Sequence, residues 1–107
     1  MARRKGYEFI YDPEVHRRLS AIDRRYHSLI RREIESSLRH KPDMEARNRK
    51  PLSRPSVLGT SWELRLGPQD SLRVFYRVDR ASREVHILAI GFKRGNRLFV
   101  GGEEFDL

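Results

Sequence analysis

The sequence predicts an α+β fold, in which a strand and two helices precede an antiparallel sheet. Residues 15–38 repeat apolar side chains every three or four positions, which is typical of helices with one buried face. Residues 61–79 instead alternate apolar and charged side chains on both sides of the turn GPQDS, as two paired strands do. A chain of 107 residues has room for one domain, so residues 1–107 are expected to form a single unit.

The first elements are a short strand and a helical pair. Alternating aromatic residues at 7–11 predict the strand, which follows a basic arm at residues 1–5. The segment Asp12-Pro13-Glu14 then supplies a helix cap, a proline for the first helical position and an acidic first turn. The periodic run that follows allows one long helix or two. A single helix of about 40 Å would overhang so small a domain, so we favour two helices that turn near Ile22 to Arg25.

A long basic loop is expected at residues 41–60. Pro42 ends the helical pattern, because proline has no backbone N–H to donate. Residues 46–55 contain four cations and no acid, namely Arg47, Arg49, Lys50 and Arg54. Loops of this length in compact domains are usually functional or disordered. Two interpretations stay open, phosphate contacts and a mobile, solvated loop.

Three strand-like segments follow the loop. Two of them flank GPQDS, and the third, Val85–Ile90, is almost continuously apolar, as in strands covered on both faces. Successive strand side chains point to opposite faces, so one face of the 61–79 hairpin is apolar and is expected to pack on the helices. The other face is expected to be open and carries Glu63, Arg65, Arg73, Phe75 and Arg77, with Lys93, Arg94 and Arg97 at its rim.

The predicted open face suits an anionic partner. The chain has 23 Lys and Arg against 15 Asp and Glu, a net charge of +8, and most of the excess lies in residues 1–60. A basic surface with an aromatic side chain for stacking favours single-stranded RNA or DNA. The alternative is a polar sheet face in water, which antiparallel sheets commonly have. The last residues, 101–107, form an acidic tail.

Several classes of site and location are disfavoured. The chain has no cysteine, so it has no disulfide, thiolate metal site or cysteine nucleophile. Its four histidines lack metal-ligand spacing, and we expect no metal and no small-molecule cofactor. No apolar run approaches the length of a membrane span. We therefore expect a cytoplasmic protein without a membrane partner. Any catalysis is expected to act on a phosphate through cationic side chains, with Glu63, Lys93, Tyr76 or His86 as the acid or base.

The segments WELRL, LRVFYRVD and VHILAIGFKRGNRLFVGGEEF, in this order after two helices and a basic loop, resemble the RelE/ParE superfamily of bacterial type II toxins. The resemblance covers Tyr7 to Phe99, and the tail GGEEFDL is similar to a RelE-like branch described as translational repressors. It implies the RelE-like α+β microdomain, with an N-terminal strand, a helical hairpin and an antiparallel sheet of three to four strands. It also implies a ribosome-dependent endoribonuclease that cuts mRNA through the ribose 2′-hydroxyl without a metal.

The resemblance assigns roles to residues unevenly. Arg73 matches the arginine that opens the central strand and acts on the scissile phosphate. Arg65 falls at a lysine position, and Lys93 or Arg94 at an arginine position. Glu63 replaces a lysine, and Phe99 falls near a C-terminal tyrosine. Two interpretations of Glu63 stay open, a general base beside Arg65 and an ion-pair partner of Arg73 across the hairpin, and the second is favoured.

The resemblance also implies partners and leaves alternatives. A cognate antitoxin is expected to fold on binding, to pack on the helices and the sheet edge, and to pair with Arg73 or the Arg47–Arg54 loop. The mRNA and the ribosome are the expected targets. The ParE branch shares the fold but inhibits DNA gyrase by protein contact, without nuclease activity. A catalytically decayed nucleic-acid-binding homologue is the third possibility, and it would show salt-dependent binding without toxicity.

Overall fold

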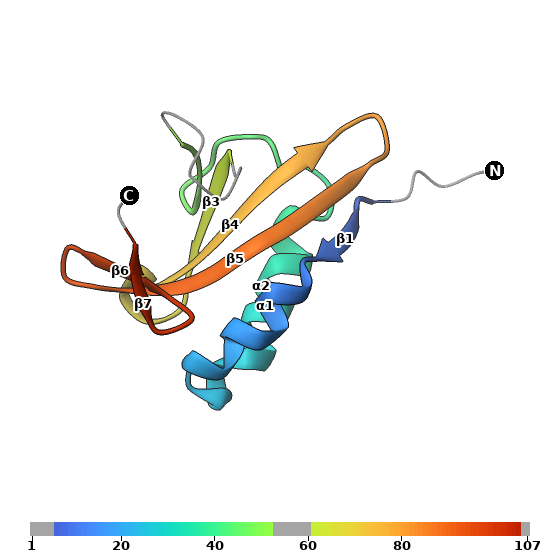
Figure 1. Cartoon of the computed structure of the whole chain (residues 1–107). Helices are drawn as coiled ribbons and strands as arrows, with labels where there is room; N and C mark the ends of the chain where they lie inside the picture. Colours follow the sequence, from blue (N-terminus) through green and yellow to red (C-terminus); the bar gives the residue numbers. More distant parts are fainter. Residues whose placement is uncertain (1–5, 53–60, 106–107) are drawn as a thin grey trace.

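The computed structural model describes residues 6–52 and 61–105, which form one seven-stranded sheet with two helices on one face (Figure 1). The strand order is β2-β3-β4-β5-β6-β7 with antiparallel neighbours, and β1 pairs in parallel with β5. The predicted α+β class is therefore confirmed. The strands are β1 Glu8–Tyr11, β2 Arg49–Pro51, β3 Trp62–Leu66, β4 Leu72–Asp79, β5 Glu84–Arg94, β6 Arg97–Val100 and β7 Glu103–Phe105.

The helical run is divided in two, as predicted. Helix α1 (Pro13–Arg18) begins after Asp12, whose Oδ1 accepts a hydrogen bond of 2.9 Å from the Glu14 amide. Helix α2 (His27–Leu38) follows after two short 3₁₀ turns separated by extended backbone at Ile22. The Nε2 atom of His27 lies 3.0 Å from the carbonyl oxygens of both Leu19 and Ile22, so this side chain closes the connection. The turns span Leu19–Ala21 and Arg24–Tyr26.

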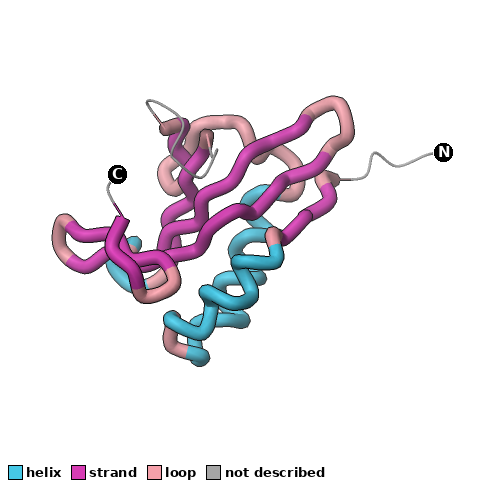
Figure 2. The backbone as a smooth tube through the Cα atoms, viewed as in Figure 1, coloured by secondary structure: helices cyan, strands magenta, loops and turns pink. Residues whose placement is uncertain are grey.

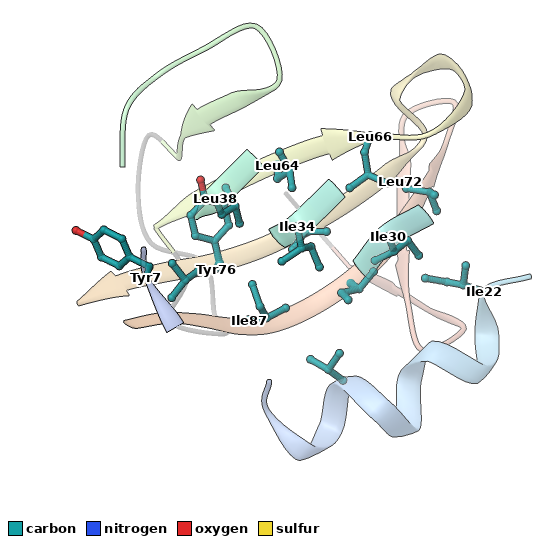
Figure 3. Close-up of a cluster of buried hydrophobic side chains, with 14 residues drawn as sticks. Tyr7, Ile22, Ile30, Ile34, Leu38, Leu64, Leu66, Leu72, Tyr76 and Ile87 are labelled. Atoms are coloured by element: carbon teal, nitrogen blue, oxygen red, sulfur yellow. The ribbon is translucent and has the colours of Figure 1, made fainter. Parts of the chain in front are cut away.

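The main core lies between α2 and the sheet, and Figure 2 shows both helices on the same side of the strands. Ile30, Ile34 and Leu38 of α2 are fully buried (Figure 3). Burial of each such side chain stabilises the fold by about 1.5 to 3 kcal/mol. The sheet side of this core comes from one face of the β3–β4 hairpin, which confirms the predicted apolar face. Its buried residues are Leu64, Leu66, Leu72, Val74 and Tyr76, and Trp62 and Val78 are partly buried beside them.

Strand β5 organises the sheet because it pairs with three other strands. Strand β4 runs along one edge of it, while β1 and β6 share the other edge, beside Glu84–Ile87 and Gly91–Arg94. The β4–β5 register shifts at Phe75 and Tyr76, which marks a β-bulge. The strand expected at residues 85–90 is thus longer than predicted, because pairing continues past Gly91 where the apolar run ends.

Two segments are more regular than the sequence predicted. The 41–60 loop contains β2, and the tail after Gly102 forms β7, so the sheet exceeds the expected three to four strands. Strands of three residues carry too little alternation to be recognised. The basic arm at residues 1–5, the loop residues 53–60 with Arg54, and residues 106–107 lie outside the described residues. No helix in the described ranges is both long and apolar enough to cross a membrane.

Candidate functional site

Two arginines converge on one carboxylate on the sheet face opposite the helices. Arg65 on β3 and Arg73 on β4 are directly opposite each other in the antiparallel pair, and Glu63 lies two residues before Arg65 on the same face. The Arg65 Nε atom donates to Glu63 Oε1 at 2.7 Å, and Arg73 Nη1 lies 3.3 Å from Glu63 Oε2. Like charges directly opposite in a sheet repel, so the carboxylate is what holds the two guanidinium groups together. The ion-pair interpretation of Glu63 is confirmed.

The Gly67–Asp70 turn also fixes Arg73. The Arg73 Nε atom donates a hydrogen bond of 2.9 Å to the Asp70 carbonyl oxygen. This leaves the Nη2 hydrogens and part of Nη1 of Arg73 for other acceptors. Within this turn Gly67 has φ 79°, and a Cβ there would lie 2.7 Å from Leu72 Cδ1. Gln69 and Asp70 also adopt positive φ, at 56° and 54°. A turn so constrained presents the Asp70 carbonyl oxygen at one fixed place.

The face that carries Arg73 is less open than the sequence predicted. Phe75 is 3% exposed and packs in a second cluster with Ala89, Leu98 and Val100, and Leu52 covers part of it. Strand β6 brings Leu98 and Val100 onto this face, because they pair with Lys93 and Gly91 of β5. The expectation that Phe75 offers a free ring for base stacking is therefore wrong. Arg73 itself is only 6% exposed.

The cations predicted at the rim lie around this covered centre. Arg73 pairs with Gly91 of β5, and Lys93 lies two residues after Gly91 on the same strand, so Lys93 is on the same face as Arg73. The Lys93 side chain is half-buried. Arg77 is exposed on the same face, opposite His86. Arg94 and Arg97 are exposed at the β5–β6 hairpin, and the Arg94 guanidinium lies 5.9 Å from the centre of the Phe92 ring.

The basic segment before β3 divides into structural and exposed cations. The Arg49 guanidinium donates from Nη1 to the Ser37 carbonyl oxygen at 2.7 Å and from Nε to the Met44 carbonyl oxygen at 3.0 Å, so it ties β2 to the end of α2. Lys50 is exposed on the face of Glu63, with which it pairs. Arg47 is exposed in the turn before β2.

That turn is well defined. The backbone of Ala46 and Arg49 exchanges two hydrogen bonds, of 2.9 and 3.2 Å, which leaves Arg47 and Asn48 at the tip of a two-residue turn. The Asn48 carbonyl oxygen accepts a hydrogen bond of 2.8 Å from the Arg65 amide. The tip of the supposed loop is therefore fixed beside the arginine pair.

A groove of about 460 Å³ lies beside the end of β3. Glu63, Arg65 and Arg73 together are called the Glu63 cluster. Arg65 lines the groove and belongs to this cluster, and Asp70 lines the groove and accepts a hydrogen bond from Arg73. The sequence did not point to most of these residues, because they come from three separate segments. The lining consists of Leu29, Glu33, Arg47, Asn48, Arg65, Leu66, Gly67 and Asp70.

Two acid–base candidates, Tyr76 and His86, lie away from the two arginines, and so does Phe99. Tyr76 faces the main core, its hydroxyl donates to the Pro42 carbonyl oxygen at 2.6 Å, and burial raises its pKa. Phe99 pairs with Phe92 on the helix side of the sheet, with the ring centres 5.4 Å apart, so it points away from the face of Arg73. His86 has Nε2 3.1 Å from Glu84 Oε1, opposite the exposed Arg77.

The described residues share their fold with a solved bacterial protein. A chain in the crystal structure of the toxin-antitoxin complex RelBE2 from Mycobacterium tuberculosis matches with a TM-score of 0.65 and 24% sequence identity. The match covers 82% of this chain and 99% of that chain. No protein-family model matches the sequence, and no curated protein matches it. The chain has a RelE-like fold.

Proposed function

We propose that this protein is the toxin of a type II toxin-antitoxin pair and that it represses translation as a ribosome-dependent mRNA endoribonuclease. The observation that carries the proposal is the convergence of Arg65 and Arg73 on one face of a RelE-like sheet, held by Glu63. Paired guanidinium groups suit the oxygens of a phosphodiester, because each presents a planar fork of donors. The match to a chain of the RelBE2 complex supports the toxin assignment.

The proposed reaction is an internal transfer at phosphorus. The ribose 2′-oxygen gives up its proton to solvent and bonds to the adjacent phosphorus, while the bond from phosphorus to the 5′-oxygen breaks. That oxygen takes a proton from solvent, so no net proton is gained or lost and the products carry a 2′,3′-cyclic phosphate and a 5′-hydroxyl. Arg73 and Arg65 stabilise the negative charge that builds on the phosphoryl oxygens, and Lys93 faces the departing oxygen.

Glu63 serves first as a positioning residue in this scheme. Both of its carboxylate oxygens already lie against guanidinium groups, which leaves little room for a third proton donor. Its place in the reaction is to keep the two arginines side by side before the substrate arrives. Preorganised donors of this kind spend little energy on reorganisation when the reaction occurs.

The proposed partner is an antitoxin segment that folds on binding. Strands β2 and β7 end the sheet on its two sides, and a paired strand at either edge would satisfy their outward backbone groups. Acidic residues on such a segment would pair with exposed cations, of which Arg47 before β2 and Lys50 within β2 are placed best. The proposed ribosomal target implies a cytoplasmic protein.

A second candidate is inhibition of DNA gyrase by protein contact, as in the ParE branch. The low exposure of Arg73 and the orientation of Phe99 away from it favour this alternative. Under it, the Glu63 cluster is a structural feature of the sheet. The exposed Arg77, Arg94 and Arg97 would then contact protein.

The two candidates differ in a direct assay. The purified chain is added to a reconstituted translation reaction with and without ribosomes, and mRNA ends are mapped at nucleotide resolution. Cuts that require ribosomes, repeat with the codon phase and leave a cyclic phosphate support the nuclease. Intact mRNA together with inhibited DNA supercoiling by gyrase supports the second candidate and excludes the first.

A further inference from the structure

The groove beside β3 is built from three segments of the chain that meet next to Arg65. One wall is the two-residue turn with Arg47 and Asn48, and it is anchored by the Arg49 guanidinium and by the hydrogen bond from the Arg65 amide. The second wall is the end of β3 with Gly67 and Asp70. Helix α2 closes the third side, and its Ile30 and Ile34 are fixed in the core next to the groove.

The lining has a composition that suits a nucleotide. Leu29 and Leu66 supply apolar surface against which a ring can pack, and the volume of about 460 Å³ lies in the range of small-molecule sites. Arg47 and Arg65 add positive charge to the lining, which suits a phosphate. A strand bound at Arg65 with one phosphate therefore has a place for a neighbouring base in this groove.

The carboxylates in the groove decide which bases fit. Within the described part of the chain, Glu33 and Asp70 have carboxylates without a hydrogen-bond or ion-pair partner, although both line the groove. An ionised carboxylate only accepts hydrogen bonds, so it favours a base edge that donates. Cytosine, adenine and guanine have an exocyclic amino group, whereas the corresponding position of uracil is a carbonyl oxygen.

We infer that the groove is a base subsite that binds a nucleotide with an exocyclic amino group, next to the phosphate handled by Arg65 and Arg73. The inference rests on the proposed function in that it places an RNA strand on this face. Beyond that function, the groove makes the protein itself selective for the base that lies next to the reacting phosphate. Cytosine is preferred over uracil because its 4-amino group donates to Glu33 or Asp70.

Binding to short, uncleavable strands tests the inference without any reaction. Fluorescein-labelled tetranucleotides of 2′-O-methyl cytidine and 2′-O-methyl uridine have no 2′-hydroxyl to react, and their rings are similar in size. Their affinities for the full chain are measured by fluorescence anisotropy at one low salt concentration. We expect the cytidine strand to bind about tenfold more tightly, the discrimination of one good contact to a base edge.

Matched variants locate the preference. The double variant Glu33→Gln and Asp70→Asn, which keeps side-chain size, is expected to bring the two affinities within about twofold of each other. Glu8→Gln, an exposed substitution on β1 outside the groove, is expected to preserve the tenfold ratio. Arg47→Gln is expected to weaken both strands alike, since a phosphate contact is insensitive to sequence.

Three results would overturn the inference. They are equal affinities for the two strands, a ratio that survives in the double variant, and no binding of either strand. Each of these is independent of catalysis, because the strands cannot be cut. A protein that fails to cleave mRNA on ribosomes yet discriminates cytidine from uridine through Glu33 and Asp70 would retain the base subsite and lose the proposed nuclease.

Discussion

Glu63 and Arg73 form an ion pair across strands β3 and β4, in which Oε2 lies 3.3 Å from Nη1 and the two side chains are 6% and 8% exposed. A buried pair of this kind adds little net stability, because desolvation offsets the attraction. Its breakage is costly, since one charge then stays buried alone. Arg65 on the other carboxylate oxygen makes Glu63 the shared counterion of two cations.

Removal of that counterion should therefore destabilise the fold strongly. Glu63→Ala leaves Arg73 buried without its carboxylate and opposite Arg65, and we expect a loss of about 3 to 5 kcal/mol in the free energy of unfolding. Glu63→Gln, which keeps an acceptor, should lose less. Urea unfolding measures both, with Glu8→Ala as an exposed control. A Glu63→Ala protein as stable as the control would show that the cluster is not maintained in solution.

The hydroxyl of Tyr76 should contribute to the stability of the fold. The hydrogen bond to the Pro42 carbonyl oxygen joins β4 to the segment after α2, in a site where Tyr76 is fully buried. Tyr76→Phe leaves that carbonyl without its donor, at a cost of about 1 to 3 kcal/mol. Thermal or urea unfolding at neutral pH measures the loss. An unchanged stability would mean that another donor replaces the hydroxyl.

The same hydroxyl predicts a dependence on alkaline pH. Burial raises the pKa of Tyr76 above its ordinary value, Asp43 adds to the rise and Arg49 opposes it. Below about pH 10 the Tyr76 hydroxyl keeps its proton in both the folded and the unfolded state, so its contribution to the free energy of unfolding is fully present. Above that pH the unfolded state loses its proton first, and the free energy of unfolding falls toward the raised pKa of the folded state.

Comparison with Tyr76→Phe isolates this effect. The variant lacks the titrating group, so its free energy of unfolding should fall less between about pH 8 and about pH 11 than that of the wild type. All other tyrosines, lysines and arginines are common to both proteins. Parallel curves over this interval would contradict the assignment to Tyr76.

Gly91 should tolerate no side chain. It lies opposite Arg73 on β4 and Val100 on β6, and an added Cβ would contact the Phe99 carbonyl oxygen and lie 2.9 Å from Val100 Cγ2. Gly91→Ala therefore forces β6 away from β5, with an expected loss of about 1 to 3 kcal/mol or more. Gly95→Ala is no matched control because of its positive φ, so the comparison is Ser82→Ala at an exposed turn. Equal stability of the two variants would contradict the close approach of β6.

Local patterns explain why much of the fold was predictable. The Asp12 cap, the break near Ile22 and the alternation in residues 61–79 each depend on neighbours in the chain. The predicted pairing of Glu63 with Arg73 followed from the same alternation, once a turn at GPQDS set the register.

Contacts between distant segments explain the errors. Phe75 lies on a charged face by alternation, and Leu98 and Val100 of the returning β6, together with Leu52, cover it. The groove needs the turn at Arg47 and Asn48 to meet the end of β3, which depends on Arg49 reaching the end of α2. No pattern within a window of the sequence shows such contacts.

In the proposed function Arg73 acts on the scissile phosphate, and single-turnover cleavage of ribosome-bound mRNA measures this role directly. Arg73→Ala and Arg73→Lys are compared with the wild type and with Arg24→Ala, an exposed arginine at the helical turn, after unfolding curves confirm that each protein is folded. We predict a fall of about 100-fold or more for Arg73→Ala, a smaller fall for Arg73→Lys and none for Arg24→Ala. Codon-phased cleavage at the wild-type rate by folded Arg73→Ala would contradict the claim.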